Sequence, residues 1–290
     1  MLVRALIIGC GYVGAALGAR LVREGHEVVG VRRSVAGTEL DAAGIHALAA
    51  DITVPEHLAR LPRAVDWVVH CVASGGGPED YRRVYWEGAR NILSWLADAP
   101  PAKFIYTSST SVYGQNDGSV VTESSPAEPV AETARILAST ERLFLDAAGR
   151  GFPCVILRVA GIYGRGRGYW LQQFLRGEAR IEGDGGRVLN MIHRDDVVGA
   201  IVAALNAGRP GEIYNAVDDE PVSQRECLEW IAAAVGAAVP AAAAAPERKR
   251  GVTSKRVANQ KLKTELGYTF EYPTFRDGWR AEIRRLGLEP

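Results

Sequence analysis

Three glycines near the N-terminus have the spacing of a phosphate-binding turn. Gly9, Gly11 and Gly14 form the pattern Gly-x-Gly-x-x-Gly, with Tyr12 and Val13 before the last glycine. In such a turn the first glycine permits a tight bend, the second lets a pyrophosphate approach the backbone, and the third lets a helix pack against a sheet. The free N–H groups at the start of that helix then favour the phosphates. The spacing therefore predicts a dinucleotide site.

The end of the second predicted strand indicates which dinucleotide is bound. A site for NAD(H) usually carries Asp or Glu about 20 residues after the glycines, because the carboxylate bonds the ribose 2′-OH. Here the strand ends in Val31, Arg32, Arg33 and Ser34, without an acid. Guanidinium groups suit a 2′-phosphate through charge-assisted bonds. We therefore expect NADP(H) to be preferred over NAD(H); the alternative is that the two arginines are solvated on a loop.

These residues can act together only if an ordered sheet positions them, and the hydrophobic pattern predicts such a sheet. Strands are expected at 5–8, 27–31, 46–51, 66–71, 103–107 and 153–158, with helices at about 13–24, 79–97 and 130–148. Repeated alternation of apolar strands and amphipathic helices predicts an α/β fold with a doubly wound parallel sheet of the Rossmann type. After Gly161 the pattern becomes irregular, and that half is the expected substrate side.

Composition and charge exclude several classes of protein. The 290 residues include 34 basic and 34 acidic side chains, so the formal net charge is +0. A neutral chain has no overall field to hold nucleic acid or an anionic membrane. No apolar run reaches the length of a membrane span. We therefore expect a small-molecule substrate, with neither nucleic acid nor membrane as a partner.

The cysteines indicate a reducing compartment. Cys10, Cys71, Cys154 and Cys227 are far apart and form no Cys-x-x-Cys pair. This spacing favours reduced thiols over a disulfide framework or a metal site. The first strand also begins close to Met1, so we expect no signal peptide and a cytoplasmic location.

Further short motifs follow the glycine turn in a characteristic order. They lie at 50–52, 70–73, 86–91, 106–114, 157–158, 162–164, 190–197 and 211–215. Taken together, their order and spacing resemble the extended short-chain dehydrogenase/reductases, in particular the NAD-dependent epimerase/dehydratase group. The resemblance extends over nearly the whole chain.

The resemblance implies a two-part architecture with the ligands between the parts. The Rossmann domain would comprise 1–160 plus about 188–216, and a smaller substrate domain would comprise about 161–187 plus 217–290. Besides the glycine turn and the two arginines, the residues implied to border the cofactor are Asp51, Ile52, Cys71, Val72, Ala73 and Thr107. The family also often pairs its crossover helices into a homodimer, which is therefore a candidate assembly here.

The resemblance also implies a hydroxyl that bonds the reacting oxygen just after the fifth strand. In this sequence that residue is Ser109, with Ser111 beside it as a candidate substrate contact. A hydroxyl at the carboxyl end of a central strand points into the ligand crevice of such a sheet. The alternative is a polar loop whose hydroxyls cap nearby backbone.

The catalytic pair of the family is absent. That pair is Tyr-x-x-x-Lys, in which the phenol exchanges a proton with the substrate and the lysine lowers the phenol pKa and holds the nicotinamide ribose. None of the five lysines has a tyrosine four places before it; they are Lys103, Lys249, Lys255, Lys261 and Lys263. If Glu141 is matched to the acid that follows the motif in the family, Thr133 takes the tyrosine position and Leu137 the lysine position. The chain thus resembles an atypical member.

Two explanations of the missing pair remain open. In the first, the protein is an NADP(H)-dependent oxidoreductase or epimerase/dehydratase, acting on a sugar-like or anionic molecule with another proton donor. The candidate donors are Tyr113 and Tyr163, whose alternative role is packing, and Arg135 could supply a positive charge. In the second, the protein is a non-catalytic NADP(H)-binding sensor whose partner responds to cofactor occupancy.

The second half offers further charged candidates. Arg165 and Arg167 lie in the glycine-rich stretch 164–168, where they would face an anionic substrate or be solvated. His193 is a candidate substrate contact whose alternative role is packing. The basic residues 248–250 and 255–256 are expected to form a solvated face, although the later segment resembles the closing part of the family fold, where a basic residue borders the substrate cleft.

Overall fold

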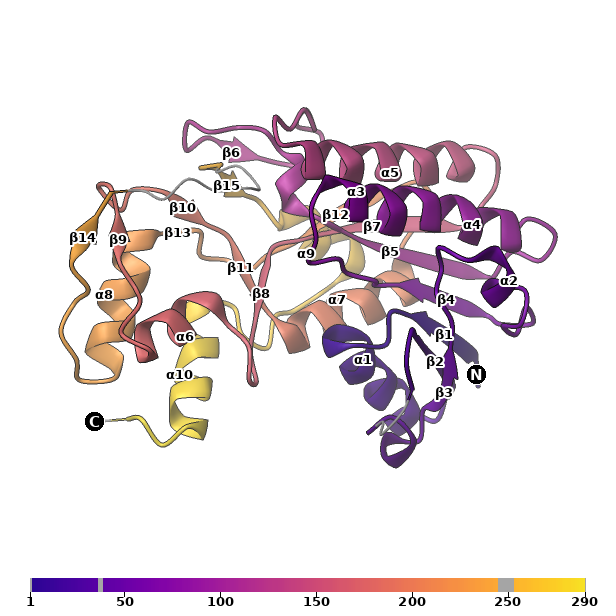
Figure 1. Cartoon of the computed structure of the whole chain (residues 1–290), viewed down its shortest axis with the longest axis horizontal. Helices are drawn as coiled ribbons and strands as arrows, with labels where there is room; N and C mark the ends of the chain where they lie inside the picture. The colour runs from indigo at the N-terminus through magenta and orange to yellow at the C-terminus, as the bar shows by residue number, and fades with distance from the viewer. Residues whose placement is uncertain (1, 36–38, 245–252, 290) are drawn as a thin grey trace.

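The computed structural model describes residues 2–35, 39–244 and 253–289. Its central feature is a seven-stranded sheet in the order β12-β7-β5-β4-β1-β2-β3, in which every neighbouring pair is parallel. The strands are β1 (Arg4–Ile8), β2 (Glu27–Arg32), β3 (His46–Ala49), β4 (Trp67–His70), β5 (Lys103–Ser109), β7 (Cys154–Val159) and β12 (Ile213–Ala216). This arrangement, on the right of Figure 1, confirms the predicted doubly wound fold.

Helices cover both faces of the sheet. On one face α1 (Tyr12–Arg23) packs against α7 (Arg194–Ala207). On the other face lie α4 (Gly88–Trp95) and α5 (Glu132–Ala148), as Figure 1 shows. The predicted helix at 79–97 begins as α3 (Pro78–Tyr81) and passes through a π-helical turn at Arg82–Glu87 before α4. Short helical turns also occur at α2 (Pro55–Leu58), Asp41–Ala43 and Thr110–Val112.

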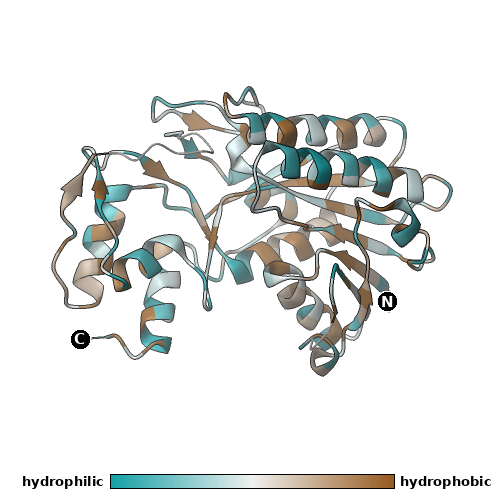
Figure 2. Cartoon of the chain, in the orientation of Figure 1, coloured by the Kyte–Doolittle hydropathy of each residue, from teal (hydrophilic) through white to brown (hydrophobic). Residues whose placement is uncertain are grey.

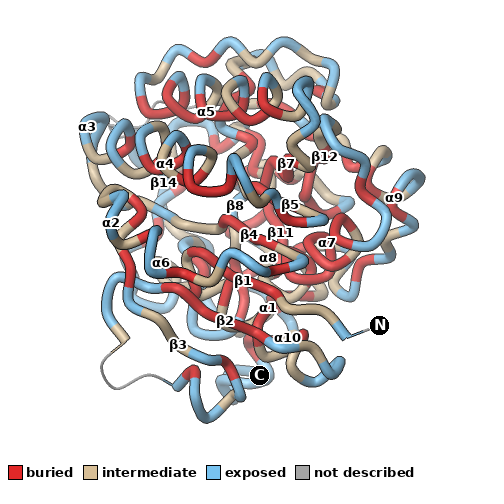
Figure 3. The backbone as a smooth tube through the Cα atoms, turned by 90° about the vertical axis from the view of Figure 1, so that its right-hand side faces the viewer, coloured by how far each residue is buried: buried red, intermediate tan, exposed pale blue. Residues whose placement is uncertain are grey.

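Burial of both sheet faces explains the continuous apolar runs of the strands. Successive side chains of a strand point to opposite faces. In β1, Ala5 and Ile7 belong to the apolar cluster that contains Leu17 of α1, whereas Leu6 and Ile8 belong to the cluster that contains Ile92 of α4. Figure 2 shows the brown strands between the layers, and Figure 3 shows the same strands buried at the centre of the molecule.

A smaller group of elements lies beyond the carboxyl ends of the strands. It contains α6 (Tyr169–Leu175), α8 (Gln224–Ala234) and α10 (Phe275–Arg285), at the left of Figure 1. Two small sheets join them: β9 (Ile181–Glu182) with β14 (Ala242–Ala243), and β10 (Val188–Leu189) with β13 (Val222–Ser223). Their shared core includes Tyr163, Leu171, Cys227 and Trp279.

Two further strand pairs connect this group to the main sheet. They are β8 (Gly161–Tyr163) with β11 (Met191–His193), and β6 (Val120–Val121) with β15 (Arg256–Val257). The helix α9 (Gln260–Leu266) packs against α7 and β12, although the chain around it belongs to the expected substrate domain. The assignment of 217–290 to one substrate domain stays a prediction. Within the described part of the chain, no helix combines the length and apolarity that a membrane crossing requires.

Candidate functional site

The glycine turn has the shape that a dinucleotide requires. Gly9 has φ +91°, and a Cβ there would lie 2.6 Å from the backbone nitrogen of Val72. A Cβ on Gly14 would lie 2.6 Å from the Gly9 carbonyl oxygen, so this glycine serves close packing. Gly11 instead borders open space, since a Cβ there would be 3.9 Å from the Gly9 carbonyl oxygen. The α1 helix then begins at Tyr12 without a side-chain cap, which leaves its first N–H groups available to phosphate oxygens.

A cavity of about 700 Å³ runs along the carboxyl ends of the strands from this turn, and we call it the dinucleotide cleft. It is bounded by nearly all the residues expected to border a cofactor: Gly9, Gly11, Tyr12, Val13, Arg32, Arg33, Asp51, Ile52, Cys71, Val72, Ala73 and Thr107. Gly14 lies behind the turn. Apart from Gly14, the residues predicted from sequence to border the dinucleotide therefore surround one cavity.

The end of the cleft at β2 and β3 is rich in arginine. Arg32 and Arg33 both line it, and the π-helical turn adds Arg83, which sequence reasoning missed, to the same wall. Asp51 accepts hydrogen bonds from Thr53 N at 2.9 Å and Thr53 Oγ1 at 2.8 Å. Burial acts to raise the pKa of Asp51, but the bonds from Thr53 and the nearby Arg33 and Arg83 hold that pKa below its usual value. Arg83 is paired with Asp80 of the same wall at 3.1 Å, so Arg32 and Arg33 are the charges that suit this end of the cleft to a negatively charged ligand group.

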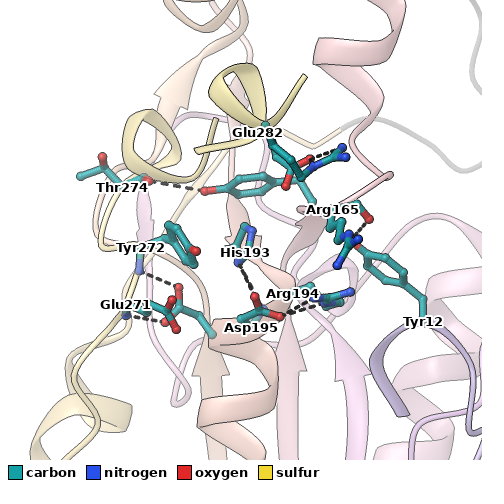
Figure 4. Close-up of polar contacts among 12 residues, drawn as sticks. Tyr12, Arg165, His193, Arg194, Asp195, Glu271, Tyr272, Thr274 and Glu282 are labelled. Atoms are coloured by element: carbon teal, nitrogen blue, oxygen red, sulfur yellow. Dashed lines mark hydrogen bonds and ion pairs between the residues drawn. The ribbon is translucent and has the colours of Figure 1, made fainter. Parts of the chain in front are cut away.

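The glycine- and arginine-rich loop at 164–168 folds over the start of α1. Its two ends are joined by backbone hydrogen bonds between Gly164 and Arg167 of 2.9 and 2.8 Å. The Tyr12 hydroxyl donates to the Arg165 carbonyl at 3.2 Å, and the Arg167 guanidinium lies 5.1 Å from the centre of the Tyr12 ring. Figure 4 shows Arg165 and Arg194 beside Tyr12. Arg167 consequently lines the dinucleotide cleft, although we had expected it to face a substrate.

A second cavity, of about 320 Å³, lies beside the end of β5, and we call it the Ser109 cavity. Ser109 and Ser111 line it together with Trp170, Asn190, Lys255 and Trp279. Ile162 lines both this cavity and the dinucleotide cleft, so the two spaces adjoin. Ser109 Oγ accepts the Ser111 N–H at 3.1 Å, as the capping alternative expected, and its own hydroxyl proton remains available to a ligand.

The two tyrosines considered as proton donors direct their hydroxyls into the protein. Tyr113 is fully buried, and its hydroxyl donates to Asn215 Oδ1 at 2.8 Å. The Tyr163 ring lines the Ser109 cavity, but its hydroxyl donates to the Thr274 carbonyl at 3.4 Å. Burial, as the largest effect, raises the pKa of both phenols above the usual value. This geometry matches the packing alternative for both side chains.

The helix that carries the catalytic pair in the family carries no substitute here. Thr133 and Leu137, the positions matched to tyrosine and lysine, are 6% and 4% exposed on α5. Arg135 is exposed on the other side of that helix and lines neither cavity described above. No residue of α5 lines either cavity, so this helix supplies no proton donor to them.

His193 has a structural setting. It is 3% exposed, and its Nδ1 accepts the Asp195 N–H at 3.2 Å, which caps the start of α7. Its ring centre is 5.4 Å from that of Tyr163 and 3.9 Å from that of Tyr272, and Figure 4 shows the Tyr272 ring beside it. Burial lowers its pKa. Because it lines neither cavity described above, His193 is placed for packing and capping, and not for the substrate contact that we expected.

A buried ion pair supports the end of β5, where Ser108 borders the dinucleotide cleft. Arg158 Nη2 lies 2.7 Å from Glu141 Oε2, and both side chains are at most 5% exposed. The Ser108 hydroxyl donates to Glu141 Oε1 at 2.5 Å. Sequence reasoning used Glu141 only as a marker for the missing motif; its contacts fix β5, β7 and α5 relative to one another.

Lys255 was expected on a solvated face, but it is 3% exposed and lines the Ser109 cavity. Arg256 is exposed in β15, as the solvated face predicted, and residues 248–250 lie outside the described residues. No group of three or more metal-binding side chains occurs among the residues that the structure describes.

Similarity to known proteins extends over the whole cleft. The model of the NAD dependent epimerase/dehydratase family matches residues 5–216. The chain is 28% identical over 277 residues to Protein YeeZ of Escherichia coli K12, a match that covers 93% of this chain and 96% of YeeZ. It is 26% identical to the UDP-glucose 4-epimerase of Corynebacterium glutamicum, with 93% of each chain covered.

A solved structure shows the same overall arrangement. It is DesIV of Streptomyces venezuelae, a dTDP-glucose 4,6-dehydratase with NAD and TYD bound. Its TM-score is 0.85 at 25% identity, and the match covers 97% of this chain and 96% of DesIV.

Proposed function

The chain belongs to the NAD dependent epimerase/dehydratase family, and from this premise we propose that it is an NADP(H)-dependent oxidoreductase or epimerase/dehydratase acting on a small anionic or sugar-like molecule. The observation that carries the proposal is the dinucleotide cleft, in which the glycine turn faces open space and Arg32 and Arg33 stand where an acid would favour NAD(H). The preference for NADP(H) is inferred from these residues of the chain itself, because DesIV holds NAD.

Each part of the cleft has a role in this proposal. The first N–H groups of α1 bind the pyrophosphate, and Arg32 and Arg33 bind the 2′-phosphate. Arg167 lies over the glycine turn, where its charge favours the pyrophosphate from the opposite side. When bound, the cofactor supplies or accepts a hydride. Ser109 donates a hydrogen bond to the reacting oxygen in the adjoining cavity.

The cofactor preference is tested by binding alone. We expect wild-type protein to bind NADPH more tightly than NADH in a fluorescence titration, because only NADPH carries the 2′-phosphate. Arg32→Ala should weaken NADPH binding on the order of tenfold, as expected for one charge-assisted contact, and leave NADH nearly unchanged. Equal affinities of the wild type for the two cofactors would contradict the proposed preference.

Turnover separates an enzyme from a cofactor sensor. The protein would be incubated with NADPH and a panel of carbonyl compounds and nucleotide sugars while cofactor absorbance is followed. If the protein is an enzyme, the turnover rate with its substrate should fall on the order of 10²-fold in Ser109→Ala, because the hydrogen-bond donor to the reacting oxygen is removed. Tight NADPH binding without turnover across the panel would instead support a non-catalytic NADP(H)-binding sensor, whose best support in the chain is the buried Leu137 at the lysine position.

A further inference from the structure

Lys255 brings a positive charge to the wall of the Ser109 cavity without a carboxylate to balance it. The residue is 3% exposed, and its Nζ donates to Thr253 Oγ1 at 2.7 Å. Among the described residues no acidic side chain pairs with it, and burial alone accounts for its lowered pKa. A hydroxyl satisfies one of the three ammonium protons. The charge therefore lacks a counter-ion within the described part of the chain.

The backbone around Lys255 is held on both sides, so the side chain belongs to a built wall. Asn190 Nδ2 donates to the Lys255 carbonyl at 2.9 Å, and Asn190 Oδ1 accepts the Val257 N–H at 2.8 Å. Val257 lies in β15, which pairs with β6. One asparagine thus fixes the segment against the start of β11, and Asn190 itself lines the cavity.

The whole cavity is suited to negative charge. None of the described residues that line it is acidic, and its polar groups include the hydroxyls of Ser109, Ser111 and Thr253. Arg187 also lines it, but Glu182 lies 3.6 Å from that guanidinium. An isolated buried ammonium is strongly unfavourable unless a partner supplies the opposite charge. A bound anion would supply that charge for Lys255.

We propose that Lys255 binds a carboxylate or phosphate group of the substrate, so that the Ser109 cavity selects small molecules carrying an oxyanion beside the oxygen that Ser109 contacts. This inference rests on the proposed function, because it takes the Ser109 cavity as the substrate site. The volume of about 320 Å³ is at the lower end of the range of small-molecule sites, and Trp170 and Trp279 provide apolar walls for the carbon skeleton.

The test uses the full-length protein without cofactor. Calorimetric titrations with malonate and with methyl phosphate identify which oxyanion fits, and neutral malonamide controls for shape without charge. We expect the wild type to bind at least one anion and not malonamide. Lys255→Met should weaken that binding at least tenfold, and Lys255→Arg should retain it. Lys263→Met, which removes a lysine on α9 paired with Asp219, should bind as the wild type does.

The dependence on pH distinguishes direct binding from a structural role. Burial lowers the pKa of Lys255 to about 8. Malonate is doubly ionised at pH 7 and above, so its affinity should be constant between pH 7 and about 8 and fall about tenfold per pH unit above that. The affinity of Lys255→Arg should stay flat. The other titratable side chains at the cavity are Arg187, Tyr163 and Tyr169; the arginine stays charged and burial raises the pKa of Tyr163.

Three results would overturn the inference: wild-type affinity in Lys255→Met, a pH-independent wild-type affinity between pH 7 and 10, or no anion binding by the wild type at tens of millimolar. A separate NADPH titration keeps the proposals apart. If the wild type fails to bind NADPH, the proposed function fails while the anion measurement still stands. If NADPH binds and the anions do not, only the role of Lys255 is lost.

Discussion

At the scale of single residues, the buried pair of Glu141 and Arg158 should be the most sensitive polar contact supporting the end of β5. Glu141→Gln leaves the Arg158 guanidinium buried without its counter-charge, and breaking such a pair costs about 3–5 kcal/mol of unfolding free energy. Urea unfolding followed by fluorescence measures this. Glu265→Gln is the matched control, because its partner Arg209 is 64% exposed and an exposed pair contributes about 0–1 kcal/mol. Equal losses of unfolding free energy in Glu141→Gln and Glu265→Gln would contradict the greater contribution of the buried pair.

The buried Lys255 should also appear in the pH dependence of stability. Below pH 8 its ammonium is protonated in the folded and unfolded states, so the cost of burying the charge is fully present. Between pH 8 and the unfolded lysine pKa of about 10.4, the folded protein releases the proton first, and stability rises because the unfolded state binds more protons. The wild type should gain up to about 3 kcal/mol relative to Lys255→Met over this range. Denaturant unfolding of both proteins at several pH values measures the difference, and parallel curves would disprove it.

At the scale of elements, the loop at 164–168 should contribute to the affinity for both cofactors and not to the preference for NADPH over NADH. Arg167→Ala removes a charge above the glycine turn. In the proposed function this turn binds the pyrophosphate, which both cofactors share. It should therefore weaken NADPH and NADH by the same factor, on the order of tenfold. Arg165→Ala is the control, because the Arg165 carbonyl and not its side chain contacts Tyr12. A loss confined to NADPH would place Arg167 at the 2′-phosphate instead.

The elements themselves were largely predictable, whereas the contacts between distant loops were not. The hydrophobic pattern located the first six strands of the sheet, because five of them are continuous apolar runs buried on both faces; β3, at the edge of the sheet, is only partly buried. The place of the 164–168 loop depends on Tyr12, some 150 residues away in the chain, and no local pattern reports such a contact. The burial of Lys255 likewise depends on Asn190 and β6. From the sequence alone, Lys255 beside Arg256 cannot be told apart from a solvent-exposed lysine.

At the scale of the whole molecule, Asp196 connects the sheet layer to the last segment of the chain. It is fully buried in α7 and accepts hydrogen bonds from the Tyr268 hydroxyl at 2.7 Å, Glu271 N at 2.7 Å and Tyr272 N at 3.0 Å. Asp196→Asn replaces an acceptor oxygen by a donor. We expect it to lose about 2–3 kcal/mol of stability, because hydrogen bonds to a buried charged group are the strong ones.

The same change should loosen the segment that leads into α10. Limited proteolysis should therefore cut Asp196→Asn near 268–275 faster than the wild type. Asp195→Asn is the control, since Asp195 is half-exposed and pairs with Arg194. Wild-type stability and a wild-type cleavage rate in Asp196→Asn would show that other residues hold this segment to α7.

The homodimer implied by the family resemblance stays a prediction, to be measured by light scattering against the chain mass of 31.2 kDa.

The packing of Thr133 and Leu137 limits how the catalytic pair of the family could be placed on this chain. A lysine at position 137 alone would bury an uncompensated charge, and a tyrosine at position 133 alone would force a ring into a closely packed helix face. Each substitution alone is therefore unfavourable. Placing Tyr-x-x-x-Lys on α5 of this chain would require both substitutions together with repacking of the residues around positions 133 and 137.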